Sequence, residues 1–61
     1  MKYMQLLEQC LEDKKTARIY LSSHVFDGTV IALDAIEVEL RNREQSRIIV
    51  ALADIVAVSI A

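Results

Sequence analysis

The residues of this chain that could carry out chemistry are few and scattered. It has one histidine, His24, and one cysteine, Cys10, and neither has a partner at a spacing typical of a catalytic or metal site. We expect His24 to be a turn residue and Cys10 to be a reduced thiol packed in a core. Asp34 is a candidate carboxylate catalyst, but its side chain more often accepts backbone N–H bonds in a turn. We therefore predict that the protein is not an enzyme and uses no metal or cofactor.

The positively charged residues form two groups in the sequence. One group surrounds the end of a predicted helix and the other a predicted polar turn: Lys14, Lys15 and Arg18, and then Arg41, Arg43 and Arg47. Repeated around a symmetric assembly, these groups would form basic belts, and clustering of charge governs affinity for nucleic acids more than net charge does. The alternative interpretation is a solvated helix end and a solvated hairpin tip, because acidic residues lie among both groups.

The composition predicts that the chain assembles with copies of itself or with another protein. It has 61 residues, of which 54% are hydrophobic. A domain of this size buries only about 60% of its unfolded surface, and the single cysteine excludes an internal disulfide. The apolar runs 48–52 and 55–60 leave too few polar positions for a solvent-facing side or a protected edge. We expect a subunit interface that includes Ile48, Val50, Leu52, Ile55, Val56, Val58 and Ile60.

Charge and hydropathy narrow the classes of partner. The net charge of −2 argues against a strongly basic nucleic-acid binder. The longest apolar runs are far shorter than the roughly 20 residues of a membrane helix, and the start shows no signal-peptide pattern. We expect a cytoplasmic protein with no membrane partner and no small-molecule substrate.

Hydrophobic spacing predicts one domain over residues 1–61, with a helix over 1–15 and a five-stranded β-structure over 16–61. Apolar residues three and four apart predict the amphipathic helix, and the polar stretch 13–16 ends it. Dense β-branched residues and alternation predict strands over 17–22, 25–33, 36–40, 47–52 and 55–60. This order indicates a mainly β fold with one N-terminal helix.

The only glycine, Gly28, has two interpretations. Asp27-Gly28 is a typical type I′ hairpin turn, which would give one long hairpin with arms 18–26 and 29–40. Alternatively, Gly28 lies inside a strand and lets it bend sharply, and the turn falls at 22–24. We favour the second interpretation, because it leaves five strands of similar length.

The order of these elements and several residues resemble the Sm/LSm family, especially its bacterial branch, the Hfq proteins. The residues that carry the resemblance extend over nearly the whole chain: Ile19-Tyr20-Leu21, Gly28, Leu33-Asp34, Val38, Leu40, Asn42 and Ile55. The resemblance implies a helix on a strongly bent five-stranded antiparallel Sm-like barrel. It also implies a homo-oligomeric ring, in which the fourth strand of one subunit pairs with the fifth strand of the next. The stretch 22–27 is one residue shorter than in Hfq and lacks its turn glycine.

The resemblance further implies where RNA would bind. Sm-type rings hold bases in pockets made by the loop after the second strand, here with Ala35 and Ile36, and the loop between the fourth and fifth strands. Ile36 stands where the family has an aromatic, and Glu37 and Asp54 would repel phosphate. Tyr20 matches the tyrosine with which Hfq stacks purines, and stacking contributes about 1–3 kcal/mol per base. The alternative for this tyrosine is packing against its neighbours in the sheet.

Two functions therefore stay open. The first, which we favour, is the subunit of a ring that binds single-stranded RNA weakly or with altered specificity. Its candidate RNA-binding residues are Tyr20, Ala35, Ile36, Lys14, Lys15, Arg41, Arg43 and Arg47. The second is a ring of the same architecture that serves as a structural or protein-interaction module without binding RNA.

Overall fold

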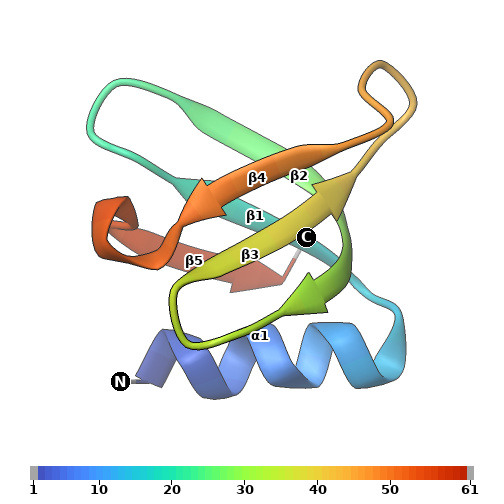
Figure 1. The fold of residues 1–61 in the computed structure, drawn as a ribbon, viewed down its shortest axis with the longest axis horizontal. Coiled ribbons are helices and arrows are strands. Elements are labelled where there is room, and N and C mark those ends of the chain that lie inside the picture. The colour runs from blue at the N-terminus through green and yellow to red at the C-terminus, as the bar shows by residue number, and fades with distance from the viewer. Residues whose placement is uncertain (1, 61) are drawn as a thin grey trace.

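The computed structural model describes residues 2–60, which form one α-helix followed by five β-strands (Figure 1). The elements are α1 (Lys2–Asp13), β1 (Thr16–Tyr20), β2 (Val25–Leu33), β3 (Glu37–Arg41), β4 (Ile48–Ala51), a 3₁₀ turn η1 (Leu52–Asp54) and β5 (Ala57–Ile60). The prediction of an N-terminal helix and a five-stranded antiparallel sheet is confirmed. The last strand is shorter than the sequence predicts, because residues 55 and 56 connect η1 to β5 without belonging to a strand.

Helix α1 presents an apolar face to the sheet and ends slightly earlier than the sequence predicts. Leu7 and Cys10 on this face are fully buried, in agreement with the helical spacing. The helix ends at Asp13, so the predicted end at residue 15 is two residues too far. Lys14 has a φ of 55°, and the N–H of Lys15 donates to the carbonyl of Cys10 at 3.1 Å. A residue in the left-handed region followed by this bond is a common way to close a helix, although glycine usually occupies the position.

The five strands form one sheet in the order β4-β3-β2-β1-β5. The long strand β2 belongs to both halves of it: its first part pairs with β1 and its second part with β3. The pairing with β3 shifts register between Val30 and Ala32, which bends the strand locally. In Figure 1, β3 and β4 therefore cross in front of β1 and β5, and α1 lies along one open side.

Gly28 lies inside β2, opposite Ala17 of β1, so the interpretation that places it within a strand is confirmed and the Asp27-Gly28 hairpin is excluded. The first turn falls instead at 21–24, where the N–H of Leu21 donates to the carbonyl of His24 at 2.8 Å. Gly28 does not have a positive φ. Its missing side chain matters because a Cβ there would lie 2.9 Å from the carbonyl oxygen of Arg41 in β3.

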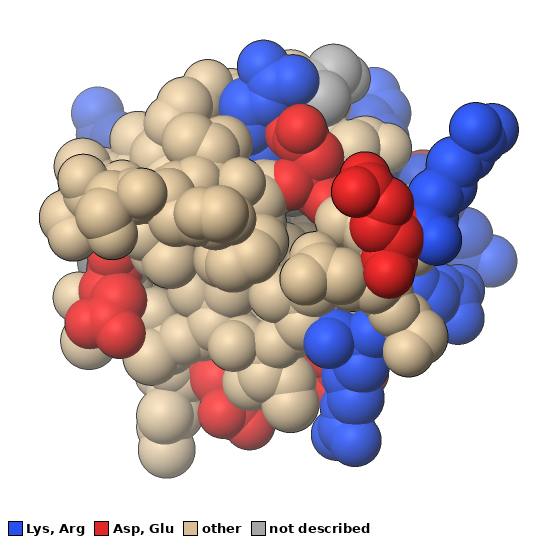
Figure 2. All heavy atoms as spheres, turned by 90° about the horizontal axis from the view of Figure 1, so that it is seen from above, with Lys and Arg blue, Asp and Glu red and all other residues tan. Residues whose placement is uncertain are grey.

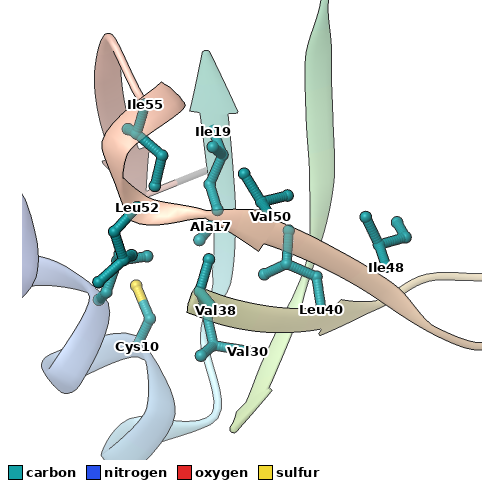
Figure 3. Packing of buried hydrophobic residues seen from close by; sticks show 11 residues of the cluster. Cys10, Ala17, Ile19, Val30, Val38, Leu40, Ile48, Val50, Leu52 and Ile55 are labelled. Carbon is teal, nitrogen blue, oxygen red and sulfur yellow. The ribbon is translucent and has the colours of Figure 1, made fainter. Parts of the chain in front are cut away.

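The hydrophobic core lies between the two halves of the bent sheet and is closed by α1 (Figure 3). Its members come from the helix, from the first four strands and from the segment around η1: Leu7, Cys10, Ala17, Ile19, Val30, Val38, Leu40, Ile48, Val50, Leu52 and Ile55. Burial raises the pKa of the Cys10 thiol, with a smaller opposing effect from Lys15. Cys10 is thus a packing residue, as expected. No helix within residues 2–60 is long and apolar enough to cross a membrane.

Candidate subunit and nucleic-acid interfaces

Strands β4 and β5 are the two edges of the sheet. In the described part of the chain, β4 pairs only with β3, and β5 pairs only with β1. Each edge strand therefore has one side whose backbone N–H and C=O groups have no strand partner, which is the arrangement that accepts a strand from another chain. The sheet does not close on itself within one subunit.

The predicted interface residues divide into two sets. Four of them, Ile48, Val50, Leu52 and Ile55, pack in the core of the subunit itself and are at most 8% exposed. Their side chains therefore belong to the core of the subunit, and their part in a subunit interface stays a prediction. The other set is accessible: Val56 is 67% exposed, Ile60 is 38% exposed and Val58 is half-buried.

The sequence did not single out Ile49 as an interface residue, although its side chain is 47% exposed on the outer side of β4. It stands opposite Glu39 of β3 and between two buried neighbours. Since successive side chains of a strand point to opposite faces, burying residues 48 and 50 forces residue 49 outward. The alternation of apolar and acidic residues over 36–40 could have indicated that Ile49 points outward. β4 pairs with that strand, and paired residues project from the same face of the sheet.

The two loops that the resemblance associates with RNA lie side by side. The N–H of Leu52 in η1 donates to the carbonyl of Ile36 at 2.8 Å. Asp34 shapes the first loop: its Oδ1 accepts the N–H groups of Ile36 at 2.8 Å and Glu37 at 2.9 Å. These bonds lower the pKa of the Asp34 carboxyl, because they favour its charged form. The expected turn role of Asp34 is confirmed.

The surface of these loops is apolar and acidic. Ile36 is 74% exposed and Ala35 is exposed beside it. Glu37 and Asp54 are exposed as well, and η1 contains no cation. These groups are unfavourable for phosphate. We call this part of the molecule, residues 34–37 and 52–56, the loop end.

Tyr20 ends β1 next to the loop end. It is half-buried, stands between Val25 and Ala57 in the sheet, and its carbonyl accepts the N–H of Val56 at 2.8 Å. The pKa of Arg18, two residues earlier, is raised chiefly by its hydrogen bond to Asp27 and next by the side chain of Tyr20. The side chain of Tyr20 is thus partly covered by its neighbours in the sheet and partly exposed to solvent.

The cations gather at the opposite end of the molecule from the loop end. Figure 2 shows most of the Lys and Arg side chains of this face on the side where the β3–β4 loop lies in Figure 1. The ion pairs formed within residues 2–60 are Arg18 Nε to Asp27 Oδ1 at 2.7 Å and Arg47 Nε to Glu39 Oε2 at 3.3 Å. The other four predicted cations form no ion pair with another described residue, and we call the part of the surface that carries them the basic end: Lys14, Lys15, Arg41 and Arg43.

Two hollows flank the β3–β4 loop at the basic end. The first has a volume of about 420 Å³ and is lined by Thr16, Asp27, Gly28, Thr29, Arg41, Asn42 and Arg43. The second, of about 400 Å³, shares Asp27, Asn42 and Arg43 with the first and also includes His24, Phe26 and Glu44 in its lining. His24 stacks obliquely on Phe26, with ring centroids 4.4 Å apart. No group of three or more potential metal ligands occurs in residues 2–60.

The predicted RNA-binding residues therefore do not form one site within a subunit. Tyr20, Ala35 and Ile36 lie at or beside the loop end, and Lys14, Lys15, Arg41 and Arg43 lie at the basic end, while Arg47 is engaged by Glu39. The sequence matches no protein-family model, and no curated protein is significantly similar to it.

Proposed function

We propose that this protein is the subunit of a homo-oligomeric ring of Sm-like architecture that binds single-stranded RNA. The observation that carries the proposal is the pair of free edges, β4 and β5, in one strongly bent sheet. When β4 of one copy pairs with β5 of the next, each growing assembly still presents one free edge of each kind. Such a head-to-tail contact repeats until the rotation closes a ring. The five strands of each subunit then act as one open Sm-like barrel whose edges are covered by its neighbours.

Side-chain exposure at the edges supports this assembly. Ile49 on β4, and Val56 and Ile60 at β5, are large aliphatic side chains open to solvent in the isolated subunit. Natural edge strands usually carry charges, prolines or bulges that prevent pairing, and neither β4 nor β5 contains a charged residue. Backbone pairing supplies affinity in this mode of association, and the apolar side chains beside it add burial.

The RNA component of the proposal rests on the basic end and on Tyr20. Lys14, Lys15, Arg41 and Arg43 form no ion pair within residues 2–60. Copied around a ring, they make a repeated belt of positive charge, although each chain has a net charge of −2. Phosphate contacts from such cations supply sequence-independent affinity. The open part of Tyr20 offers a stacking surface for a base. Because the loop end is acidic and apolar, we assign the phosphate contacts to the basic end and not to the loops in which the Sm family holds bases.

The assembly is tested by sedimentation velocity and native mass spectrometry at micromolar concentration. We expect a discrete oligomer for the wild type and smaller species for Ile49→Lys, because a lysine on β4 opposes strand addition while remaining compatible with Glu39 in the same subunit. Ile36→Lys is the matched control, since Ile36 is also solvent-accessible but lies outside the edge strands. A well-folded wild-type monomer would refute the ring.

The RNA component is tested by filter binding of the assembled protein with A-rich and U-rich oligonucleotides at low and moderate salt. We expect measurable binding that weakens steeply with salt. At a given salt concentration, Tyr20→Ala should bind the oligonucleotides more weakly than the wild type. Tyr20→Phe should bind them as well as the wild type, because phenylalanine keeps the stacking face. Absence of binding to both oligonucleotides at low salt rules out RNA as the ligand.

A protein-interaction or structural ring is the second candidate function, favoured by the loop end. Its exposed Ile36 with Glu37 and Asp54 nearby is a surface better suited to a protein than to RNA. This function predicts RNA affinity no greater than that of an unrelated acidic protein. An oligonucleotide whose binding depends on Tyr20 would decide against it.

A further inference from the structure

The 420 Å³ hollow at the basic end contains a row of polar side chains that the sequence did not bring together. Thr16 of β1 pairs with Thr29 of β2, and Thr29 pairs in turn with Arg41 of β3. Directly opposed residues in adjacent antiparallel strands project from the same face of the sheet. Two hydroxyl groups and a guanidinium therefore lie in line across three strands, and all three residues line the hollow.

The charge of the hollow is positive. Its lining contains Asp27, Arg41 and Arg43, and Asp27 is already paired with Arg18 at 2.7 Å. The guanidinium groups of Arg41 and Arg43 are therefore not compensated by an acidic group of the lining. Glu44, the acidic residue of the β3–β4 loop, does not line this hollow; it lines the second hollow, to which Arg43 also contributes.

The loop that carries Arg43 is held in place by Asn42. The side-chain amide of Asn42 donates to the carbonyl of Asp27 at 2.7 Å, and its Oδ1 accepts the N–H groups of Glu44 at 3.0 Å and Gln45 at 2.8 Å. The backbone of the loop therefore has a defined position against β2 before any ligand arrives. Binding loses less free energy to ordering when the receptor is preorganised in this way.

We propose that this hollow binds a phosphodiester group of the backbone of single-stranded RNA. Arg41 and Arg43 donate charge-assisted hydrogen bonds to the phosphate oxygens, since guanidinium groups match that geometry. The hydroxyl groups of Thr16 and Thr29 donate to the same phosphate or to the adjoining sugar. The volume lies within the usual range of about 300–1,000 Å³ for ligand sites. This inference rests on the proposed function, because it locates the backbone of the RNA on the subunit.

The test compares variants by the dissociation constant and salt dependence of their binding to a twelve-residue oligoadenylate. For Arg41→Gln combined with Arg43→Gln, we expect roughly tenfold weaker binding at low salt. The slope of log K against log salt should become shallower by about 1 for each phosphate that the variant no longer neutralises. Thr29→Val removes one hydroxyl at nearly constant shape and charge, and should weaken binding a few-fold. Arg41→Gln alone should weaken binding by part of the factor expected for the double variant. Lys2→Gln, which also removes one positive charge, is its charge-matched control, because Lys2 is exposed on α1, and should change binding less than twofold.

Two further probes separate backbone from base recognition and from free phosphate. An abasic phosphodiester oligomer of equal length should show the same relative loss in the double arginine variant, whereas Tyr20→Ala should leave its affinity unchanged. Inorganic phosphate, monitored by the amide resonances of Thr16, Gly28 and Thr29, should bind far more weakly than either oligomer. Tighter binding of inorganic phosphate would reassign the hollow to a small anion and overturn the proposal.

The remaining outcomes distinguish this inference from the proposed function. If the wild type binds the oligoadenylate and the double arginine variant binds it equally well, the hollow is not the backbone site, but the RNA-binding ring stands. An equal loss in Lys2→Gln would likewise refute the hollow, because it would show a general effect of charge. If the wild type binds neither oligomer, both proposals fail.

Discussion

Replacing Gly28 by alanine should destabilise the subunit through a steric conflict with the backbone of β3. The added Cβ would lie 2.9 Å from the carbonyl oxygen of Arg41, and 3.3 Å from both the carbonyl carbon of Arg41 and the Cβ of Leu40. None of these atoms belongs to the flexible end of a side chain, so β2 and β3 must move apart. Gly28 is also buried, which leaves the new methyl group no route to solvent.

The expected magnitude follows from two opposing effects. Overpacking a well-packed site costs about 1–3 kcal/mol, whereas removing a glycine from a strand recovers about 0.5–1 kcal/mol of conformational entropy. The net loss should be about 1–2 kcal/mol, which corresponds to a fall in Tm of roughly 4–16 °C for a domain of this size. Urea unfolding followed by circular dichroism measures the loss, at two protein concentrations because assembly also stabilises the fold.

A double-mutant cycle with Arg41→Ala tests the steric reasoning for Gly28. Truncating the Arg41 side chain leaves its backbone oxygen in place, so it should not relieve the conflict, and the effects of the two substitutions should add within about 0.5 kcal/mol. Full recovery in the double variant would show that the side chain, not the backbone, opposes the methyl group. A Gly28→Ala protein as stable as the wild type would refute the close approach of β2 and β3.

Three further predictions test other parts of the fold. Lys14→Gly should raise the free energy of unfolding by about 0.5–1 kcal/mol in urea titrations, because glycine adopts a positive φ without strain, whereas Lys15→Gly should lower it. The lowered pKa of Asp34 stabilises the fold above its ordinary value of 3.8, and this contribution is lost as the pH falls through the lower folded-state pKa. Unfolding midpoints measured between pH 7 and pH 2.5 should therefore fall less steeply below pH 4 in Asp34→Asn than in the wild type, and identical profiles would contradict the assigned role. Leu40→Ala should cost about 2–5 kcal/mol in the same urea assay, because the side chain is fully buried.

Local patterns were sufficient to predict most of the secondary structure. The helix is visible as spacing of three and four in residues 3–11, and the strands as β-branched alternation, since both patterns arise from contacts between near neighbours in the chain. The choice between a hairpin at Asp27-Gly28 and a bent strand also came from strand lengths alone, and the pairing of Gly28 with Ala17 confirms it. The start of the last strand was not predictable in this way, because Ile55 and Val56 continue its apolar run in the sequence but connect η1 to β5 without belonging to a strand.

The candidate sites depended on information that is not local. The apolar character of β4 and β5 indicated that their side chains must be shielded from water. The sequence could not show how this shielding is divided between the core of the subunit and a partner. The division follows from register: opposite Val38 and Leu40, residues 50 and 48 turn inward and Ile49 turns outward. Likewise, the sequence gives no reason to separate Arg47 from Arg41 and Arg43, whereas the fold brings Glu39 beside Arg47 alone.

The sequence by itself determined the elements and their apolar faces, because periodicity is a property of residues a few positions apart. Only the tertiary structure decided which surfaces those elements expose. The row of Thr16, Thr29 and Arg41 joins residues 13 and 12 positions apart in succession, through two strand pairings whose register is set by packing across the whole sheet. Gly28 is a second example, because its place in a strand was predictable from the sequence. The reason that a glycine is needed there was not predictable: a Cβ would lie 2.9 Å from a backbone oxygen of β3, and this contact exists only in the folded sheet.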